Sequence, residues 1–155
     1  MNSKKKILVV CTGNACRSPM AEGFLRKDLS QKDGFIVKSA GISAVDGMMP
    51  TPYAVDVMKD EGIDIAGYLS SALSKDFAKA ADLILVMAQM HKKSIIDTMP
   101  ELKDKVYLYN EFAGLGDNAD IVDPIGQPLS LYKLVCSQIK EATFKIIKRL
   151  KGENL

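Results

Sequence analysis

Residue types that often bind metals or form covalent frameworks are scarce in this chain of 155 residues. The only histidine is His91, and Cys11 and Cys16 have no partners at the spacing of a zinc site, so we expect no metal. The cysteines number three, and an odd count does not make a disulfide framework. We expect the third, Cys136, to be an inert small hydrophobic residue on a helix, and His91 to be a solvated helix residue.

The chain also lacks a strong charge of one sign and a long hydrophobic run. Its formal net charge is +2, which provides no broad cationic field for nucleic acid. No window is long enough to cross a bilayer, and the first apolar run is interrupted at Thr12-Gly13-Asn14, too early for a secretory signal. We therefore expect a cytoplasmic protein with reduced thiols that binds neither nucleic acid nor membrane.

Nucleotide-binding signatures are absent as well. Neither GxxxxGK[ST] nor GxGxxG occurs, so the sequence predicts no ATP or dinucleotide loop, and we expect no cofactor. Arginine is restricted to Arg17, Arg26 and Arg149 although lysine is abundant. Any phosphate that the protein handles should therefore bind at a local site, and Arg17 is the arginine that lies in an unusual stretch.

The length and the 47% hydrophobic content fit one globular domain over residues 1–155. Short apolar runs that predict buried strands alternate with amphipathic stretches that predict helices, which indicates an α/β fold. We expect a four-stranded parallel sheet with helices on both faces, of Rossmann-like type. Strands are predicted within 7–10, 34–41, 81–88 and 103–110, and helices within 18–31, 52–62 and 130–150.

The stretch VVCTGNACRSPM, residues 9–20, places Cys11 at the end of the first predicted strand and Arg17 at the start of a helix. Amides of a tight loop before a helix N-terminus form a cradle for a tetrahedral dianion, and Gly13 is expected to permit the turn. This environment favours the thiolate of Cys11, a strong nucleophile. Arg17 can bind two phosphate oxygens, and Ser18 can donate a hydrogen bond to the thiolate.

A glycine-, aspartate- and proline-rich segment, residues 114–129, is too long for a plain connector and is predicted to be functional or mobile. Such a distant loop could deliver an acid over the cradle, and Pro124 restricts the backbone of Asp123 before it. Asp117 and Asp120 are expected to be ordinary turn residues. The tyrosines Tyr107, Tyr109 and Tyr132 are expected in the core or on the surface and are assigned no role.

The sequence CTGNACRS resembles the C-x5-R-[ST] signature of the low-molecular-weight protein tyrosine phosphatases. SPMAEG, SAG, GID, ADLILVM and DPIGQP resemble further landmarks of that family in the same order, over nearly the whole chain. The resemblance implies that Cys11 attacks phosphorus to form a phosphocysteine and that Asp123 protonates the leaving group and later activates water. It assigns phosphate binding to the loop and its flanks, namely Thr12, Gly13, Asn14, Ala15, Cys16, Arg17 and Ser18.

The resemblance also implies a phosphorylated protein as substrate, inorganic phosphate as product and inhibitor, and a monomer. In the family, a cysteine next to the arginine can form a reversible disulfide with the nucleophile, so Cys16 is a possible redox partner of Cys11. Packing of a small side chain behind the loop is the alternative for Cys16.

The chain departs from the family pattern where the substrate ring should stack. It has Ala15 in the loop, Val45 or a neighbour after the SAG segment, and Ile125 after the DP pair, where family members often have larger or aromatic residues. Phosphotyrosine is the leading expected substrate. Phosphoarginine is the alternative, although the related arginine phosphatases have threonine where this chain has Ala15.

Two other classes of protein fit the sequence less well. A dithiol redox protein, including an arsenate reductase, would use Cys11 and Cys16, but it leaves Asp123 unexplained, and VMAQMHKKSII lacks the further cysteines of the thioredoxin-linked arsenate reductases. An inactive phosphate-binding module would need neither a nucleophile nor an acid. A phosphatase therefore best explains the presence of Cys11, Arg17 and Asp123 together.

Overall fold

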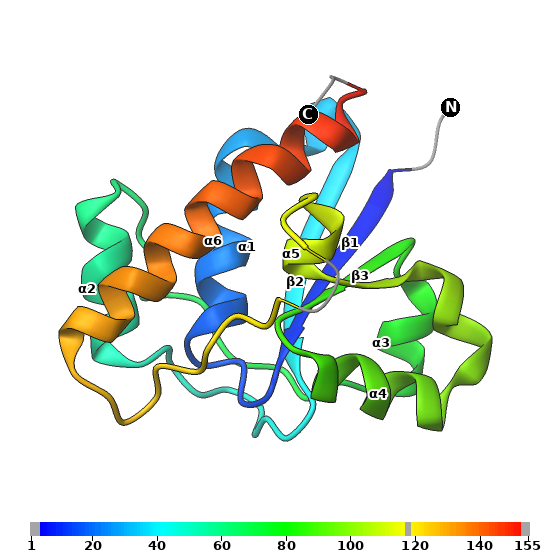
Figure 1. The fold of residues 1–155 in the computed structure, drawn as a ribbon, viewed down its shortest axis with the longest axis horizontal. Helices are drawn as coiled ribbons and strands as arrows, with labels where there is room; N and C mark the ends of the chain where they lie inside the picture. The colour runs from blue at the N-terminus through cyan, green and yellow to red at the C-terminus, as the bar shows by residue number, and fades with distance from the viewer. Residues whose placement is uncertain (1–3, 117–118, 153–155) are drawn as a thin grey trace.

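The computed structural model describes residues 4–116 and 119–152. A four-stranded parallel sheet forms its centre, with the strand order β2-β1-β3-β4 (Figure 1). The strands are β1 (Lys5–Cys11), β2 (Phe35–Gly41), β3 (Leu83–Val86) and β4 (Val106–Leu108). This confirms the predicted fold class. Three strands lie within their predicted ranges, and β1 extends beyond both ends of the predicted range 7–10.

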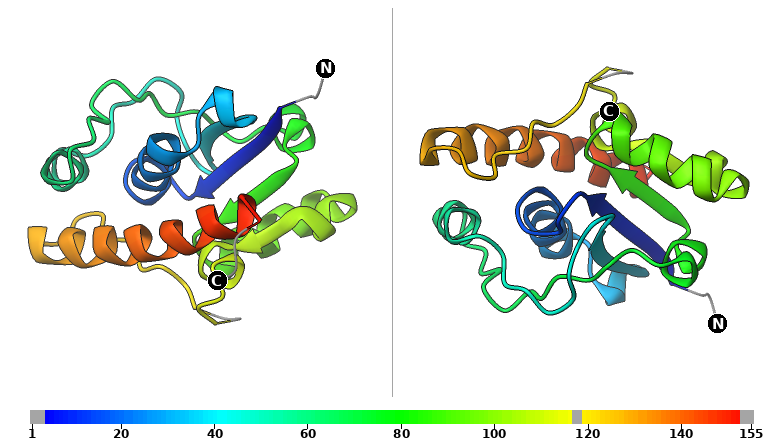
Figure 2. Two further views of the ribbon diagram at one scale, coloured as in Figure 1. Left: turned by 90° about the horizontal axis from the view of Figure 1, so that it is seen from above. Right: turned by 90° about the horizontal axis from the view of Figure 1, so that it is seen from below.

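Helices cover both faces of the sheet (Figure 2). One face carries α1 (Arg17–Asp28), α2 (Pro52–Asp60), α5 (Tyr109–Phe112) and α6 (Leu129–Leu150), and the other carries α3 (Lys75–Ala80), α4 (Gln89–Thr98) and a 3-10 helix (Pro100–Lys105). A second 3-10 helix (Gln31–Asp33) precedes β2. Within the described ranges, no helix is both long and apolar enough to cross a membrane.

Alternation along β1 divides the core in two. Ile7, Val9 and Cys11 face the side of α1 and α6, whereas Leu8 and Val10 face the side of α3 and α4. Both sets are almost fully buried, which explains why β1 reads as a continuous apolar run rather than as an alternating one.

The first strand and its neighbours end at the same edge of the sheet. Cys11 pairs with Gly41 at the end of β2, and the amide of Met87, directly after β3, donates to the carbonyl of Val10 at 3.1 Å. The chain leaves β1 toward β2 on one side and reaches β3 on the other, so the loop after β1 lies at the switch point where α/β proteins bind ligands.

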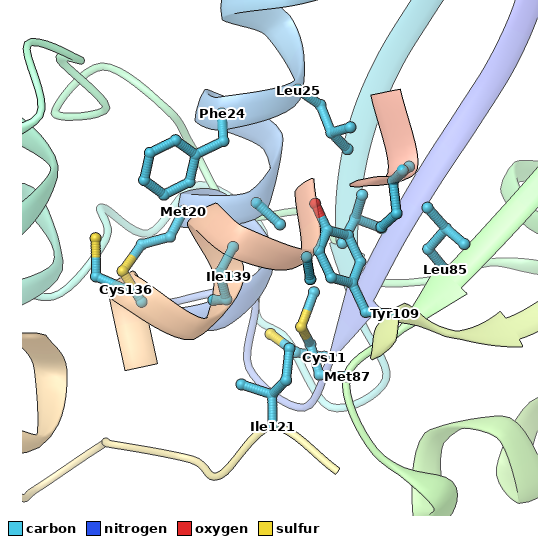
Figure 3. Close-up of a cluster of buried hydrophobic side chains, with 14 of the residues drawn as sticks. Cys11, Met20, Phe24, Leu25, Leu85, Met87, Tyr109, Ile121, Cys136 and Ile139 are labelled. Carbon is cyan, nitrogen blue, oxygen red and sulfur yellow. The ribbon is translucent and has the colours of Figure 1, made fainter. Parts of the chain in front are cut away.

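Cys11 forms the end of the larger core cluster. In Figure 3 its sulfur lies near Met87 and Ile121, at the end of the cluster that is closest to the segment leading to α6. Residues 119–128, which precede α6, therefore approach the loop after β1 although they are far from it in the sequence.

Candidate active site

The backbone of the loop between β1 and α1 is arranged as an anion cradle. The carbonyl of Thr12 accepts a hydrogen bond from Ser43 N at 2.8 Å, and that of Ala15 accepts from Thr51 N at 3.0 Å. In a trans peptide the following N–H points away from the carbonyl, so these outer bonds turn amides inward. Among the described residues, none accepts a hydrogen bond from an amide of residues 12–16, which leaves these donors available to an anion.

Asn14 supplies the turn of this loop. It has a φ of 52°, in the left-handed region that asparagine tolerates better than most residues, and it is only 3% exposed. Its side-chain Nδ2 donates to Ser18 Oγ at 2.8 Å and to Ser39 Oγ at 2.9 Å, and its Oδ1 accepts from Ser71 N at 2.9 Å. The side chain therefore ties the loop to three separate segments.

These bonds fix the direction of the hydrogen bond at Cys11, the predicted nucleophile. Ser18 Oγ lies 2.9 Å from Cys11 Sγ, and because Ser18 already accepts from Asn14, its own hydrogen is free to point at the sulfur. A hydroxyl that donates to sulfur stabilises the thiolate over the thiol. Ser39 in turn donates to the buried carboxylate of Glu22 at 2.5 Å, which completes a chain of directed bonds behind Cys11.

The glycine that the loop requires is Gly41 rather than Gly13. The structure does not place Gly13 at a positive φ, and a Cβ added there would meet nothing closer than 3.9 Å. A Cβ on Gly41 would lie 2.7 Å from both Asn14 N and Thr12 O. The expectation that Gly13 permits the turn is therefore wrong, because Asn14 adopts the left-handed conformation and Gly41 makes room for it.

Arg17 lies beneath the loop and joins it to the segment before α6. Its Nη1 donates to the carbonyl of Ile121 at 2.8 Å, and its Nη2 lies 3.5 Å from Asp123 Oδ2. The Arg17 side chain is 5% exposed, whereas that of Asp123 is 41% exposed. The structure thus brings together the predicted nucleophile, arginine and acid, which are more than a hundred residues apart at the extremes.

The carboxylate of Asp123 has a defined orientation. Its Oδ1 accepts from Ile125 N at 3.1 Å, which leaves Oδ2 facing Arg17 and the loop. Asp123 and Ile125 line the mouth of a small cavity together with Cys11, Gly13, Ala15, Cys16 and Arg17. Val45, the other position of a weakened substrate wall, is 70% exposed and does not line it.

His91 is not the solvated helix residue expected from the sequence. It is 1% exposed, its Nδ1 accepts from Ala88 N at 3.1 Å, and its Nε2 lies 2.8 Å from Thr12 Oγ1. Burial, reinforced by the positive charge of Arg17, lowers its pKa from 6.5 to about 4. The ring is therefore neutral at pH 7, and because Nδ1 accepts, the proton lies on Nε2 and is donated to Thr12.

Cys16 also has contacts that the sequence did not indicate. Its Sγ lies 3.3 Å from Thr51 Oγ1 and 3.4 Å from Tyr132 Oη, so Tyr132 is a neighbour of the site rather than a residue without a role. Burial raises the pKa of the Cys16 thiol and raises that of Tyr132 to about 12. All three cysteines are free in the structure.

The remaining candidates lie away from the cavity. Cys136 is packed beside Met58, with 3.8 Å between the sulfurs, and burial raises its pKa to about 11, as expected of an inert residue. Asp120 is more than a turn residue, since its Oδ1 accepts from Gln89 N at 2.8 Å at the start of α4. Asp117 lies outside the described residues. Tyr109 is buried in the core, as predicted.

Comparison with known proteins supports the family resemblance that the sequence shows. Residues 6–155 match the family model of low molecular weight phosphotyrosine protein phosphatases. The chain belongs to this family. Members are cysteine-dependent hydrolases, and the comparisons give no support to the dithiol redox alternative.

The relatives include phosphatases with two substrate specificities. A protein-arginine-phosphatase of Geobacillus stearothermophilus is 37% identical over 148 residues, covering 96% of this chain and 97% of that protein. A probable low molecular weight protein-tyrosine-phosphatase of Ralstonia nicotianae shows the same identity, length and coverage. The solved arginine phosphatase from Geobacillus stearothermophilus matches with a TM-score of 0.89 and 36% identity, covering 96% of this chain and 94% of that one.

Proposed function

We propose that this protein hydrolyses phosphotyrosine in protein substrates through a phosphocysteine intermediate. The observation that carries the proposal is the convergence of Cys11, Arg17 and Asp123 around one small cavity, with a hydroxyl of Ser18 aimed at the sulfur. Phosphate binding falls to the inward amides of residues 12–17 and to the guanidinium of Arg17, and these groups follow the charge of the phosphoryl oxygens into the transition state.

In the first step, the thiolate of Cys11 attacks phosphorus while the bond from phosphorus to the leaving oxygen breaks. Asp123 Oδ2, which faces the cavity, gives its proton to that oxygen. A bound dianion would take over the guanidinium of Arg17 and place negative charge beside Asp123, which favours the protonated carboxyl that this step requires.

In the second step, water attacks the phosphocysteine. The Asp123 carboxylate accepts a proton from that water, the bond between sulfur and phosphorus breaks, and inorganic phosphate leaves with Cys11 again a thiolate. Ser18 is able to support the sulfur as a leaving group, because its hydrogen bond at 2.9 Å favours the thiolate. Inorganic phosphate fits the same cradle and is expected to inhibit.

Phosphoarginine is the second candidate substrate. Two observations favour it: a protein named as an arginine phosphatase is as similar to this chain as a tyrosine phosphatase is, and the cavity wall has a methyl group at Ala15. Against it, Ala15 has no hydroxyl to contact a guanidinium. Ile125, which is 52% exposed at the mouth, offers an aliphatic wall to a tyrosine ring instead.

The deciding experiment compares phosphate release from two peptides of matched sequence, one with phosphotyrosine and one with phosphoarginine, in the presence of a chelator. Cys11→Ser is the blank, because a hydroxyl is a far weaker nucleophile than a thiolate. A higher kcat/KM on phosphotyrosine supports the proposal, and preference for phosphoarginine replaces it with the second candidate. Full activity of Cys11→Ser would refute the phosphocysteine mechanism for both.

A protective disulfide between Cys11 and Cys16 is a further part of the proposal. Both thiols are buried at the same cavity, and negative charge on Cys11 is among the causes that raise the pKa of Cys16. Mild peroxide would convert Cys11 to a sulfenic acid, and attack by Cys16 would release water and form the disulfide. Mass spectrometry should then find that disulfide, whereas sulfinic acid at Cys11 without it would rule out protection.

The monomeric state and the cytoplasmic location stay predictions from the sequence. Size-exclusion chromatography with light scattering tests the first, and fractionation of cells that contain the protein tests the second. The extent of the domain, residues 1–155, also stays a prediction; the family match covers residues 6–155.

A further inference from the structure

We propose that His91, as the neutral ring protonated on Nε2, is a positioning residue that holds Thr12 and thereby orients the first part of the phosphate-binding loop. The inference rests on the proposed function, because it names a residue that acts through the cradle. His91 does not line the cavity itself and therefore acts only through Thr12.

Thr12 is held from two sides. Its carbonyl accepts from Ser43 N at 2.8 Å, and its hydroxyl is 2.8 Å from His91 Nε2. The carbonyl bond alone leaves the Thr12 side of the peptide able to rotate about its own φ and ψ. A second bond to the side chain removes that freedom, and so fixes the amide of Gly13, which belongs to the same peptide as the Thr12 carbonyl.

The other side of the His91 ring is fixed by α4. Nδ1 accepts from Ala88 N at 3.1 Å, at the start of that helix. The same helix start holds the segment that carries Asp123, because Gln89 N donates to Asp120 Oδ1 at 2.8 Å and Ile121 N donates to Met87 O at 2.8 Å. The junction of β3 and α4 is thus a common support for the acid segment and, through His91, for the phosphate loop.

Histidine suits this place because its ring accepts at one nitrogen and donates at the other. Lysine and arginine cannot accept from Ala88 N, and either would add a positive charge beside Arg17. Arg17 opposes a charge on the ring, while Asp120 and Asp123 act in the opposite sense more weakly, so the neutral ring is the stable form. Asparagine and glutamine can each replace one of the two bonds, which provides matched variants.

The test compares His91→Asn with His91→Gln. Asparagine keeps an acceptor at the short reach of Nδ1 but loses the donor to Thr12, whereas glutamine keeps a donor at the longer reach of Nε2. We expect His91→Asn to lower kcat by about ten-fold or more with a smaller change in KM, since misplaced groups near the reacting atoms reduce rates by up to about 10². His91→Gln should restore most of that loss.

Thr12→Val and Thr12→Ser complete the design. Valine has the shape of threonine without its hydroxyl, and serine keeps the hydroxyl. Thr12→Val should lower kcat about as much as His91→Asn, and the double variant should be no worse than either. Thr12→Ser keeps the hydroxyl that accepts from His91 and should therefore retain a higher kcat than Thr12→Val. Additive losses in the double variant, or equal kcat for wild type and His91→Asn, would overturn the proposal.

Two further readouts separate this role from a loss of folding and from a failure of the proposed function. Because His91 is the only histidine, nitrogen NMR of the tag-free protein reports its ring without ambiguity, and a proton on Nδ1 at pH 7 would contradict the proposal even if no variant folds. Inorganic phosphate or tungstate binding by calorimetry should weaken in His91→Asn. If wild type binds the anion but hydrolyses no phosphorylated substrate, the proposed function fails and this inference does not.

Lys93→Ala is the control on the same helix. Lys93 is exposed, and within residues 4–116 and 119–152 its one ion pair is with Asp97 at 2.6 Å, four residues away on α4. Its loss should perturb the helix without reaching Thr12, so kcat and anion binding should match wild type. A loss in Lys93→Ala as large as that in His91→Asn would mean that any disturbance of α4 has this effect.

Discussion

The two segments that form the site are held in different ways. The phosphate loop combines buried and half-buried residues and is held by directed hydrogen bonds, with Asn14 3% exposed and contacting three segments. The acid segment is fixed at Asp120 and Ile121 but exposed beyond them, where Val122 and Ile125 are 54% and 52% exposed. In the proposed mechanism, the phosphate loop binds the group common to all substrates, and the exposed acid segment meets the part that differs between them.

The difference predicts how variants should behave. Damage to the phosphate loop should affect all substrates alike, because every substrate presents the same phosphoryl group. Damage to the acid segment should depend on the leaving group and on the residue that carries the phosphate. Each variant below therefore has both a magnitude and a substrate pattern.

The largest effect is expected from Asp123→Asn. Loss of a general acid costs typically about 10²–10⁴ in rate, and less when the leaving group needs no proton. The measurement is kcat for a phosphotyrosine peptide beside that for an aryl phosphate with an acidic phenol. If kcat falls by the same factor for both substrates, Asp123 is not the general acid, and the contrast between the two segments fails.

The second prediction concerns His91, which contacts both the phosphate loop and the start of α4. Because the pKa of His91 is lowered from 6.5 in the unfolded chain to about 4 in the fold, the unfolded chain binds more protons between these values. The contribution of the neutral His91 ring to folding stability is therefore fully present above pH 6.5 and is lost as the pH falls toward 4. Between pH 7 and pH 4.5, wild type should lose about 2 kcal/mol more unfolding free energy than His91→Gln.

Urea titrations of both proteins at the two pH values measure this difference. Equal losses in wild type and His91→Gln would show that the ring titrates near its ordinary value in the fold. The buried position between Ala88 and Thr12 would then be wrong.

The third prediction concerns the Asn14 side chain in the phosphate loop. Asn14→Gly keeps the positive φ without strain and removes the amide that orients Ser18, so it isolates the side chain from the backbone. We expect a drop in kcat/KM of about 10- to 100-fold, in the range found when residues that orient a reactive group are removed. The factor should be the same for good and poor leaving groups, unlike that of Asp123→Asn.

The smallest effect is expected at the exposed rim. Ile125→Phe adds an aromatic wall at the cavity mouth, and aromatic pairs contribute about 0.5–1.5 kcal/mol beyond their buried area. The ratio of kcat/KM for phosphotyrosine over phosphoarginine should therefore rise by a few-fold to about ten-fold. An unchanged ratio would show that Ile125 does not contact the part of the substrate beyond phosphorus.

The residues of the phosphate loop are easier to predict from the sequence than Asn14 and His91, which hold that loop in place. Cys11, Arg17 and Ser18 follow a buried strand in one short stretch, so local pattern and the rule for sheet edges were enough to place them. Asp123 is predicted from the resemblance of DPIGQP to a family landmark, and the restriction that Pro124 places on its backbone supports that prediction. These are signals that lie within a few residues of each other.

The supports were missed because they depend on packing between distant segments. Glycine is the usual residue at positive φ, so the sequence points to Gly13 for the turn. Hydrogen bonds to Ser39 and Ser71 hold Asn14 in that conformation instead. His91 follows a buried strand by only a few residues, and this position at the same sheet edge as Cys11 was the available signal. Its partner Thr12 is identified only by the fold.

The measurement that tests the central claim most directly is mass spectrometry of the protein denatured during turnover of an aryl phosphate. A phosphoryl group should be found on Cys11, at a level that rises and falls with substrate, and none should be found in Cys11→Ala. Hydrolysis that proceeds in wild type without any phosphoryl group on Cys11, or with one on another residue, would contradict the account.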